Sequence, residues 1–103
     1  GTSPYMIVPK RSLIKIPDEI PTDHSLLSLC EPLAAAIQAI TTTKFERGDR
    51  VAVLGPKRLG MLLLASLIQQ RNLASPSDVI HSITIHAIHR RKKLLDFCAL
   101  LNP

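Results

Sequence analysis

Residues 51–60 read Val51-Ala-Val-Leu-Gly-Pro-Lys-Arg-Leu-Gly60, a short apolar run that stops at one glycine and resumes after another. An apolar segment from Met61 to Gln70 follows at once. Strand, glycine-bounded turn and helix in this order are typical of the first half of a βαβ unit. In such a unit the turn brings backbone N–H groups and a helix N-terminus to one point, which attracts phosphate.

The two glycines are expected to have separate roles. In a dinucleotide-binding βαβ unit, Gly55 permits the tight turn after the strand, and Gly60 lets the helix lie close to that strand. The position between them that is normally a third glycine is Lys57, whose side chain crowds a diphosphate but whose ammonium can also contact phosphate. The turn is not a P-loop, because Lys-Ser/Thr does not follow Gly60.

The rest of the chain predicts further elements on both sides of this turn. Tyr5–Pro9 and Leu13–Pro17 are short extended segments closed by prolines, and a helix is expected to open at Pro32. A second strand is predicted at Ile83–Ile88, with a last helix after it. We therefore predict an α/β fold: a partial parallel sheet in the order β-α-β-α, with a short extended N-terminal segment and a leading helix.

Composition narrows the class of protein. The 103 residues are 46% hydrophobic and carry a net charge of +5. Only 3% are aromatic, so the unstacked bases of a nucleic acid would have few aromatic side chains to stack on. Nucleic acid is therefore not expected as a partner. Wholly apolar runs such as Met61 to Ala65 are too short for a membrane span. We therefore expect a cytoplasmic protein without a membrane partner. Cys30 and Cys98 lie far apart on predicted helices and are expected to be buried free thiols.

Two or three parallel strands leave an open sheet edge and uncovered helix faces. We therefore expect a homo-oligomer, formed through the exposed sheet edge or through the apolar helix that follows Gly60.

The order and spacing of these motifs resemble the medium-chain dehydrogenase/reductase family, which includes the zinc-type alcohol, polyol and threonine dehydrogenases. The matching pieces are Val8-Pro9, Leu13-Ile-Lys-Ile-Pro17-Asp18, Glu31-Pro32-Leu33-Ala34, Gly48-Asp49-Arg50-Val51-Ala52-Val53-Leu54-Gly55 and Leu59-Gly60.

This resemblance implies a Rossmann-type nucleotide-binding domain in an oxidoreductase that transfers hydride to or from a carbonyl or alcohol. Residues 1–22 would link it to a catalytic domain outside this chain, and residues 23–103 would form its N-terminal half. In family members with this Glu-Pro-Leu-Ala motif the glutamate lies at the active site as a zinc ligand or close neighbour, so Glu31 is the candidate metal residue. Zinc would need further ligands outside this chain, no catalytic residue is assigned, and these residues alone are expected to be inactive.

The end of the second strand bears on the choice of cofactor. NAD-preferring members have an acidic residue there, whereas the matching position here is His89, followed by Arg90 and Arg91. Without an acidic residue there is no carboxylate to accept from the ribose hydroxyl of NAD, whereas arginines can bind the 2′-phosphate of NADP. NADP is therefore favoured over NAD. A solvated basic surface is the alternative interpretation of these charges.

The resulting hypothesis assigns the pyrophosphate to the turn and the ribose phosphate to the end of the second strand. The cofactor-binding residues are Gly55, Lys57, Arg58, Leu59, Gly60, His89, Arg90 and Arg91. The alternative is a degenerate, non-catalytic Rossmann-like module for interaction or regulation, whose phosphate turn is spoiled by Lys57.

Overall fold

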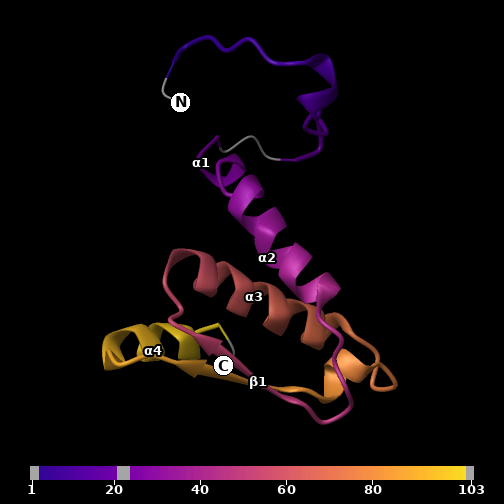
Figure 1. The fold of residues 1–103 in the computed structure, drawn as a ribbon, viewed down its shortest axis with the longest axis vertical. Helices are drawn as coiled ribbons and strands as arrows, with labels where there is room; N and C mark the ends of the chain where they lie inside the picture. Colours follow the sequence, from indigo (N-terminus) through magenta and orange to yellow (C-terminus); the bar gives the residue numbers. More distant parts are fainter. Residues whose placement is uncertain (1–2, 21–23, 102–103) are drawn as a thin grey trace.

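The computed structural model describes residues 3–20 and 24–101. Its elements, in chain order, are the short 3₁₀ helix η1 (Lys10–Ser12), α1 (His24–Leu27), α2 (Cys30–Thr42), β1 (Arg50–Leu54), α3 (Arg58–Leu73), the 3₁₀ helix η2 (Val79–Ser82), β2 (Thr84–Ile88) and α4 (Lys92–Ala99) (Figure 1). This order confirms the predicted α/β fold with its β-α-β-α core. The domain boundary expected between residues 22 and 23 lies outside the described residues.

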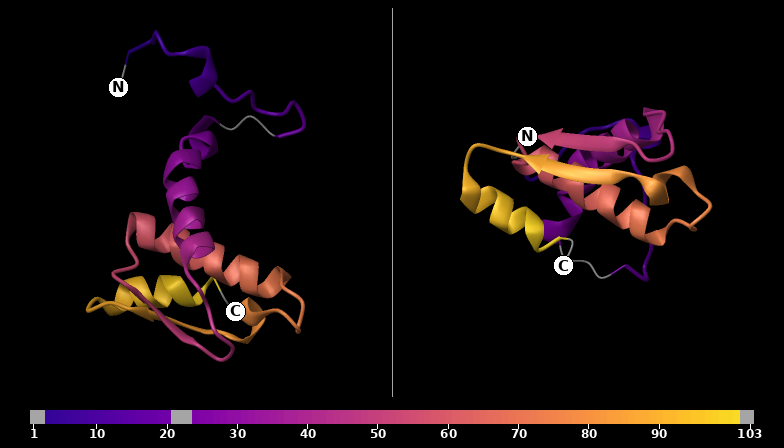
Figure 2. Two further views of the ribbon diagram at one scale, coloured as in Figure 1. Left: turned by 45° about the vertical axis from the view of Figure 1, so that its right-hand side comes forward. Right: turned by 90° about the horizontal axis from the view of Figure 1, so that it is seen from below.

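The two strands form a parallel pair, as predicted. Val51 is opposite Ile85 and Val53 is opposite Ala87, and these four side chains pack toward the hydrophobic core. Because side chains alternate along a strand, the intervening residues face the other side of the sheet. Figure 2 shows that the helices lie on one side of the sheet, and its right view, seen from below, looks onto the strands from the other side.

The core lies around α3, which packs between the sheet and α2. Its buried residues come from helices and strands alike: Ile40, Val53, Leu64, Leu67, Ile68, Ile83 and Cys98. The helix begins at Arg58 rather than at Met61, so Leu59 and Gly60 belong to its first turn.

The leading helix is present and begins before its proline. Helix α2 starts at Cys30, so Pro32 lies in the first turn, where its missing N–H removes no helical hydrogen bond. The helix ends at Thr42, and the N–H of Thr43 donates to the carbonyl oxygen of Ile40. Ala36 and Ile40 are its buried residues. The prediction that both cysteines are buried is wrong for Cys30, which is exposed at the start of this helix, whereas Cys98 is buried in the core.

Residues 3–20 extend beyond α2, away from the sheet (Figure 1). No strand occurs within this described segment, and several of its apolar side chains are exposed, including Tyr5 and Ile14. The two proline-closed segments are therefore extended but unpaired.

The helical stretch Ser25–Thr42 is long and apolar enough, by length and composition alone, to cross a membrane. Core helices of soluble proteins, which are mostly buried, and signal sequences near the N-terminus pass the same test, and 11% of this stretch is buried. Ala36 and Ile40 within it are 2% and 4% exposed, because they pack against the rest of the chain.

Candidate nucleotide-binding site

The carboxyl ends of the two strands lie side by side. Leu54 is paired with Ile88, and the backbone N–H of Gly55 donates to the carbonyl oxygen of Ile88 over 3.0 Å. Ligands of open parallel sheets bind at this edge of the sheet. The structure thus brings together the turn at Gly55 and the segment that begins at His89.

The backbone of the turn depends on both glycines. Gly55 has a φ of +67°, in the left-handed region that favours glycine. Its carbonyl oxygen accepts the backbone N–H of Lys57 over 2.6 Å. A Cβ on Gly60 would lie 2.9 Å from that same oxygen, so only glycine lets α3 approach this closely.

The N-terminus of α3 has no side-chain cap and no acidic residue in its first turn. Met61 donates its N–H to the carbonyl oxygen of Lys57 over 2.7 Å, but the N–H groups of Arg58, Leu59 and Gly60 find no acceptor in the part of the chain that the structure describes. Lys57 and Arg58 are exposed. This helix end therefore combines free N–H donors, the positive end of the helix dipole and two cations.

The second segment follows β2 at the same edge. Arg90 and Arg91 are exposed, and His89 is partly buried. The backbone N–H of Arg91 donates to Nδ1 of His89 over 2.9 Å. At the start of α4, Nζ of Lys92 lies 3.4 Å from Oδ1 of Asp96. The two residues are one helical turn apart and form an exposed ion pair.

Glu31, the candidate metal residue, lies exposed in the first turn of α2. It lines a cavity of about 530 Å³ whose other wall comes from the start of α3, including Arg58 and Leu59. The sequence did not indicate that Glu31 and Arg58 share a cavity beside the glycine turn, because nothing local links them. No group of three or more His, Cys, Asp or Glu residues that could hold a metal occurs in ranges 3–20 and 24–101.

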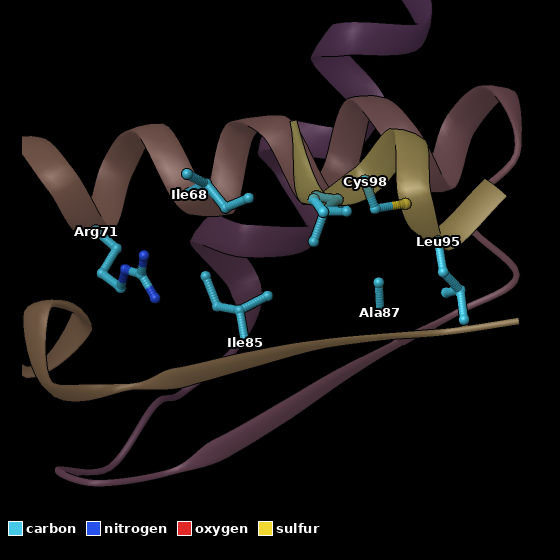
Figure 3. A pocket seen from close by; sticks show the side chains of 8 residues that line it. Ile68, Arg71, Ile85, Ala87, Leu95 and Cys98 are labelled. Atoms are coloured by element: carbon cyan, nitrogen blue, oxygen red, sulfur yellow. The ribbon is translucent and has the colours of Figure 1, made fainter. Parts of the chain in front are cut away.

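A second cavity, of about 260 Å³, lies between α3, β2 and α4 (Figure 3). Apart from Arg71 its lining residues are apolar; they include Ile68, Ile85 and Cys98, and the guanidinium of Arg71 lies at one end. None of the residues predicted to bind nucleotide lines it, so this cavity is separate from the edge where the strands end.

The other face of the sheet is open. Leu54 and Ile88 on this face are 73% and 52% exposed. His86 lies there beside Ala52, and its Nε2 atom is buried without a hydrogen-bond partner among the described residues. This face is the uncovered apolar surface that an incomplete sheet is expected to leave.

Three curated relatives of the chain are dehydrogenases or dehydrogenase-like by name. The chain is 36% identical to (R,R)-butanediol dehydrogenase of Bacillus subtilis over 65% of this chain and 19% of that protein. It is 29% identical to S-(hydroxymethyl)glutathione dehydrogenase of Komagataella pastoris (66% of this chain, 18% of that protein). It is 30% identical to an uncharacterized zinc-type alcohol dehydrogenase-like protein of Haemophilus influenzae (70% and 20%).

No family model matches the chain, and no solved structure gives a significant match. The chain spans about a fifth of the length of the curated relatives it matches. All three relatives are dehydrogenases or dehydrogenase-like by name, and one is named as zinc-type alcohol dehydrogenase-like, which confirms the resemblance to the medium-chain dehydrogenase/reductases. The chain is similar to one stretch of such an enzyme.

Proposed function

We propose that this chain is the N-terminal half of the nucleotide-binding domain of an alcohol dehydrogenase-like oxidoreductase that uses NADP in preference to NAD. The observation that carries the proposal is the hydrogen bond from Gly55 to Ile88, because it places the glycine turn next to the basic segment. The names of the curated relatives support the reaction class. The dinucleotide, when bound, would carry the hydride, and the residues of this chain would bind and orient it.

The start of α3 fits a pyrophosphate. The N–H groups of Arg58, Leu59 and Gly60 would donate to phosphate oxygens, and the helix dipole favours the negative charge. The backbone N–H of Lys57 already donates to the carbonyl oxygen of Gly55, so Lys57 would contact the pyrophosphate through its side-chain ammonium. The turn at Gly55 would keep the backbone close to the diphosphate.

The segment after β2 fits a 2′-phosphate. Arg90 and Arg91 can each make charge-assisted hydrogen bonds, which contribute roughly 1.5–3 kcal/mol apiece. NAD has only a hydroxyl at that position, and no carboxylate stands at His89 to accept from it. A preference for NADP of at least about tenfold, equivalent to roughly 1.4 kcal/mol, should follow.

Zinc does not fit the described residues by themselves. Glu31 has no second and third ligand beside it, and a protein zinc site takes at least three. We propose that Glu31 lies near the reacting centre of the complete protein, where ligands from outside this chain would be needed, and we derive no step through a metal.

Residues 1–22 are proposed to link to a catalytic domain, and residues 23–103 to form half of the nucleotide-binding domain. The open sheet face and edge are proposed to be covered in the assembled protein. A further copy of the chain, giving a homo-oligomer, is one way to cover the exposed Leu54 and Ile88.

The test is a fluorescence titration of the full-length protein with NADPH and NADH. Replacing Arg90 and Arg91 together by Ala should erase the preference for NADPH and leave NADH affinity nearly unchanged. The double variant Lys10→Ala, Arg11→Ala removes the same charge from η1 and should keep the preference. Equal affinities for the two nucleotides in the unmodified protein would contradict the proposal.

The second candidate is a non-catalytic Rossmann-like module. It is favoured by Lys57, which stands exposed where a glycine would normally let the pyrophosphate approach. In that case neither nucleotide binds at millimolar concentration, and Lys57→Gly should create binding if the side chain is the obstacle. Binding by the unmodified protein would exclude this candidate.

A further inference from the structure

We propose that the open face of the sheet binds an amphipathic helix of the full-length protein, and that Arg50 and His86 together hold a carboxylate of that helix. The face consists of every second residue of the two strands: Arg50, Ala52, Leu54, Thr84, His86 and Ile88. The inference rests on the proposal that these residues belong to half of a larger domain, but not on the choice of nucleotide.

The pairing of the strands brings the two basic residues to one place. Arg50 is opposite Thr84 and Ala52 is opposite His86, so Arg50 and His86 are diagonal neighbours on this face. Both line a hollow of about 430 Å³, together with Ala52 and Ile88. Because Ala52 has only a methyl side chain, a group from another element can reach both basic residues.

Both basic residues lack an acidic partner within ranges 3–20 and 24–101. The ion pairs in these ranges join other residues, and neither strand contains Asp or Glu. Nε2 of His86 is buried there without a hydrogen-bond partner, which costs free energy. Since His86 lines the hollow, rotation of its imidazole about the Cβ–Cγ bond would present a ring nitrogen to an acceptor on a covering element.

The chemistry of the face selects the occupant. A guanidinium has only donors and an imidazole can donate, whereas a carboxylate only accepts, so the three form charge-assisted hydrogen bonds. Next to this pair the face is apolar, with Leu54 and Ile88 both exposed. The complementary surface is therefore apolar with one Asp or Glu, as on the buried side of an amphipathic helix.

A helix of the same protein fits this face better than a second copy of the face does. Parallel sheets are covered on both sides, usually by helices, and the described helices lie on one side (Figure 2). A second copy would cover Leu54 and Ile88 but would bring no carboxylate, because β1 and β2 contain none. The chain spans about a fifth of the length of its curated relatives, so most of such a protein can supply the helix.

Carbodiimide coupling in the full-length protein tests the contact. Arg50→Lys puts a primary amine on this face, and the reagent joins an amine to a carboxylate in contact with it. Mass spectrometry should find the introduced amine linked to an Asp or Glu outside residues 1–103 of the same polypeptide. Arg47→Lys is the matched control, because Arg47 instead donates to the carbonyl oxygen of Ser77, and it should not form this link. No link in Arg50→Lys, or a link to a second copy, would overturn the inference.

Denaturant unfolding of the full-length protein distinguishes a paired from an unpaired His86. His86→Leu and Arg50→Leu should each lower the unfolding midpoint, and their combination should lower it by less than the sum, because both hold one carboxylate. Thr84→Val on the same face is the control and should change the midpoint little. A stabilised His86→Leu would show an apolar cover and overturn the inference.

Nucleotide titration keeps this inference separate from the proposed function. If the unmodified protein binds neither NADPH nor NADH but the Arg50→Lys link forms, the proposed function fails and this inference stands. If NADPH binds with the expected preference but the link is absent, this inference fails and the proposed function stands.

Discussion

Replacement of Gly60 by alanine sets two physical effects of opposite sign against each other. Alanine favours a helix interior over glycine by about 0.8–1 kcal/mol, so propensity alone predicts a stabilised protein. The added Cβ, however, would lie 2.9 Å from the carbonyl oxygen of Gly55 and 3.9 Å from Cγ1 of Val53. A contact of 2.9 Å requires a shift of several tenths of an ångström.

Hydrogen bonds hold the backbone of Gly55, so its carbonyl oxygen cannot easily move away from an added Cβ on Gly60. Its oxygen already accepts the N–H of Lys57 over 2.6 Å, and the same residue donates its N–H to Ile88. Overpacking of this kind costs typically about 1–3 kcal/mol. Since the gain from propensity is smaller in the first turn of a helix than in its interior, we expect a net loss of about 0.5–2 kcal/mol for Gly60→Ala.

The assay is thermal and denaturant unfolding of the full-length protein, together with nucleotide titration. Gly60→Ala should lower the unfolding midpoint and weaken NADPH and NADH by the same factor, because the turn moves for both. Gly48→Ala is the matched control. The φ of +82° at Gly48 strains alanine, but nothing lies within 4 Å of the added Cβ. Gly48 precedes β1, at the end of the strand opposite to the Gly55 turn. A stabilised Gly60→Ala protein with unchanged nucleotide affinity would refute the reasoning.

Three further predictions concern packing. Leu67→Ala should cost about 2–5 kcal/mol in the free energy of unfolding because Leu67 is 2% exposed, whereas Leu73→Ala, at a position 76% exposed, should change it by less than about 0.5 kcal/mol; denaturant unfolding measures both. Cys98→Ser should destabilise by about 1–3 kcal/mol because it places a hydroxyl in the core, while Cys30→Ser at an exposed position should be neutral; equal effects in calorimetry would contradict the assigned burial. The 103-residue chain by itself should self-associate through the open side of its sheet, and sedimentation that shows a folded monomer at high concentration would contradict this.

Local chemistry made much of the fold predictable. The apolar run before Gly55, the two glycines and the apolar segment after them predict strand, turn and helix without reference to distant residues. Pro32 likewise indicates a helix start, because its ring fixes φ and lacks an N–H. The sequence pattern indicates a start of α3 after Gly60, three residues later than the observed start at Arg58, because glycine favours a turn. Gly60 instead lies in the first helical turn.

Tertiary structure decided how these local elements meet. Parallel pairing of β1 with β2 places Gly55 beside Ile88, although the two are far apart in the sequence, and the register is set by which side chains pack under the sheet. Packing of α2 on α3 puts Glu31 and Arg58 around one cavity. Residue types along the chain indicate which groups can bind an anion. Only the packing of strands and helices against one another brings those groups to one edge of the sheet, because each such contact depends on burial of apolar surface between residues far apart in the sequence.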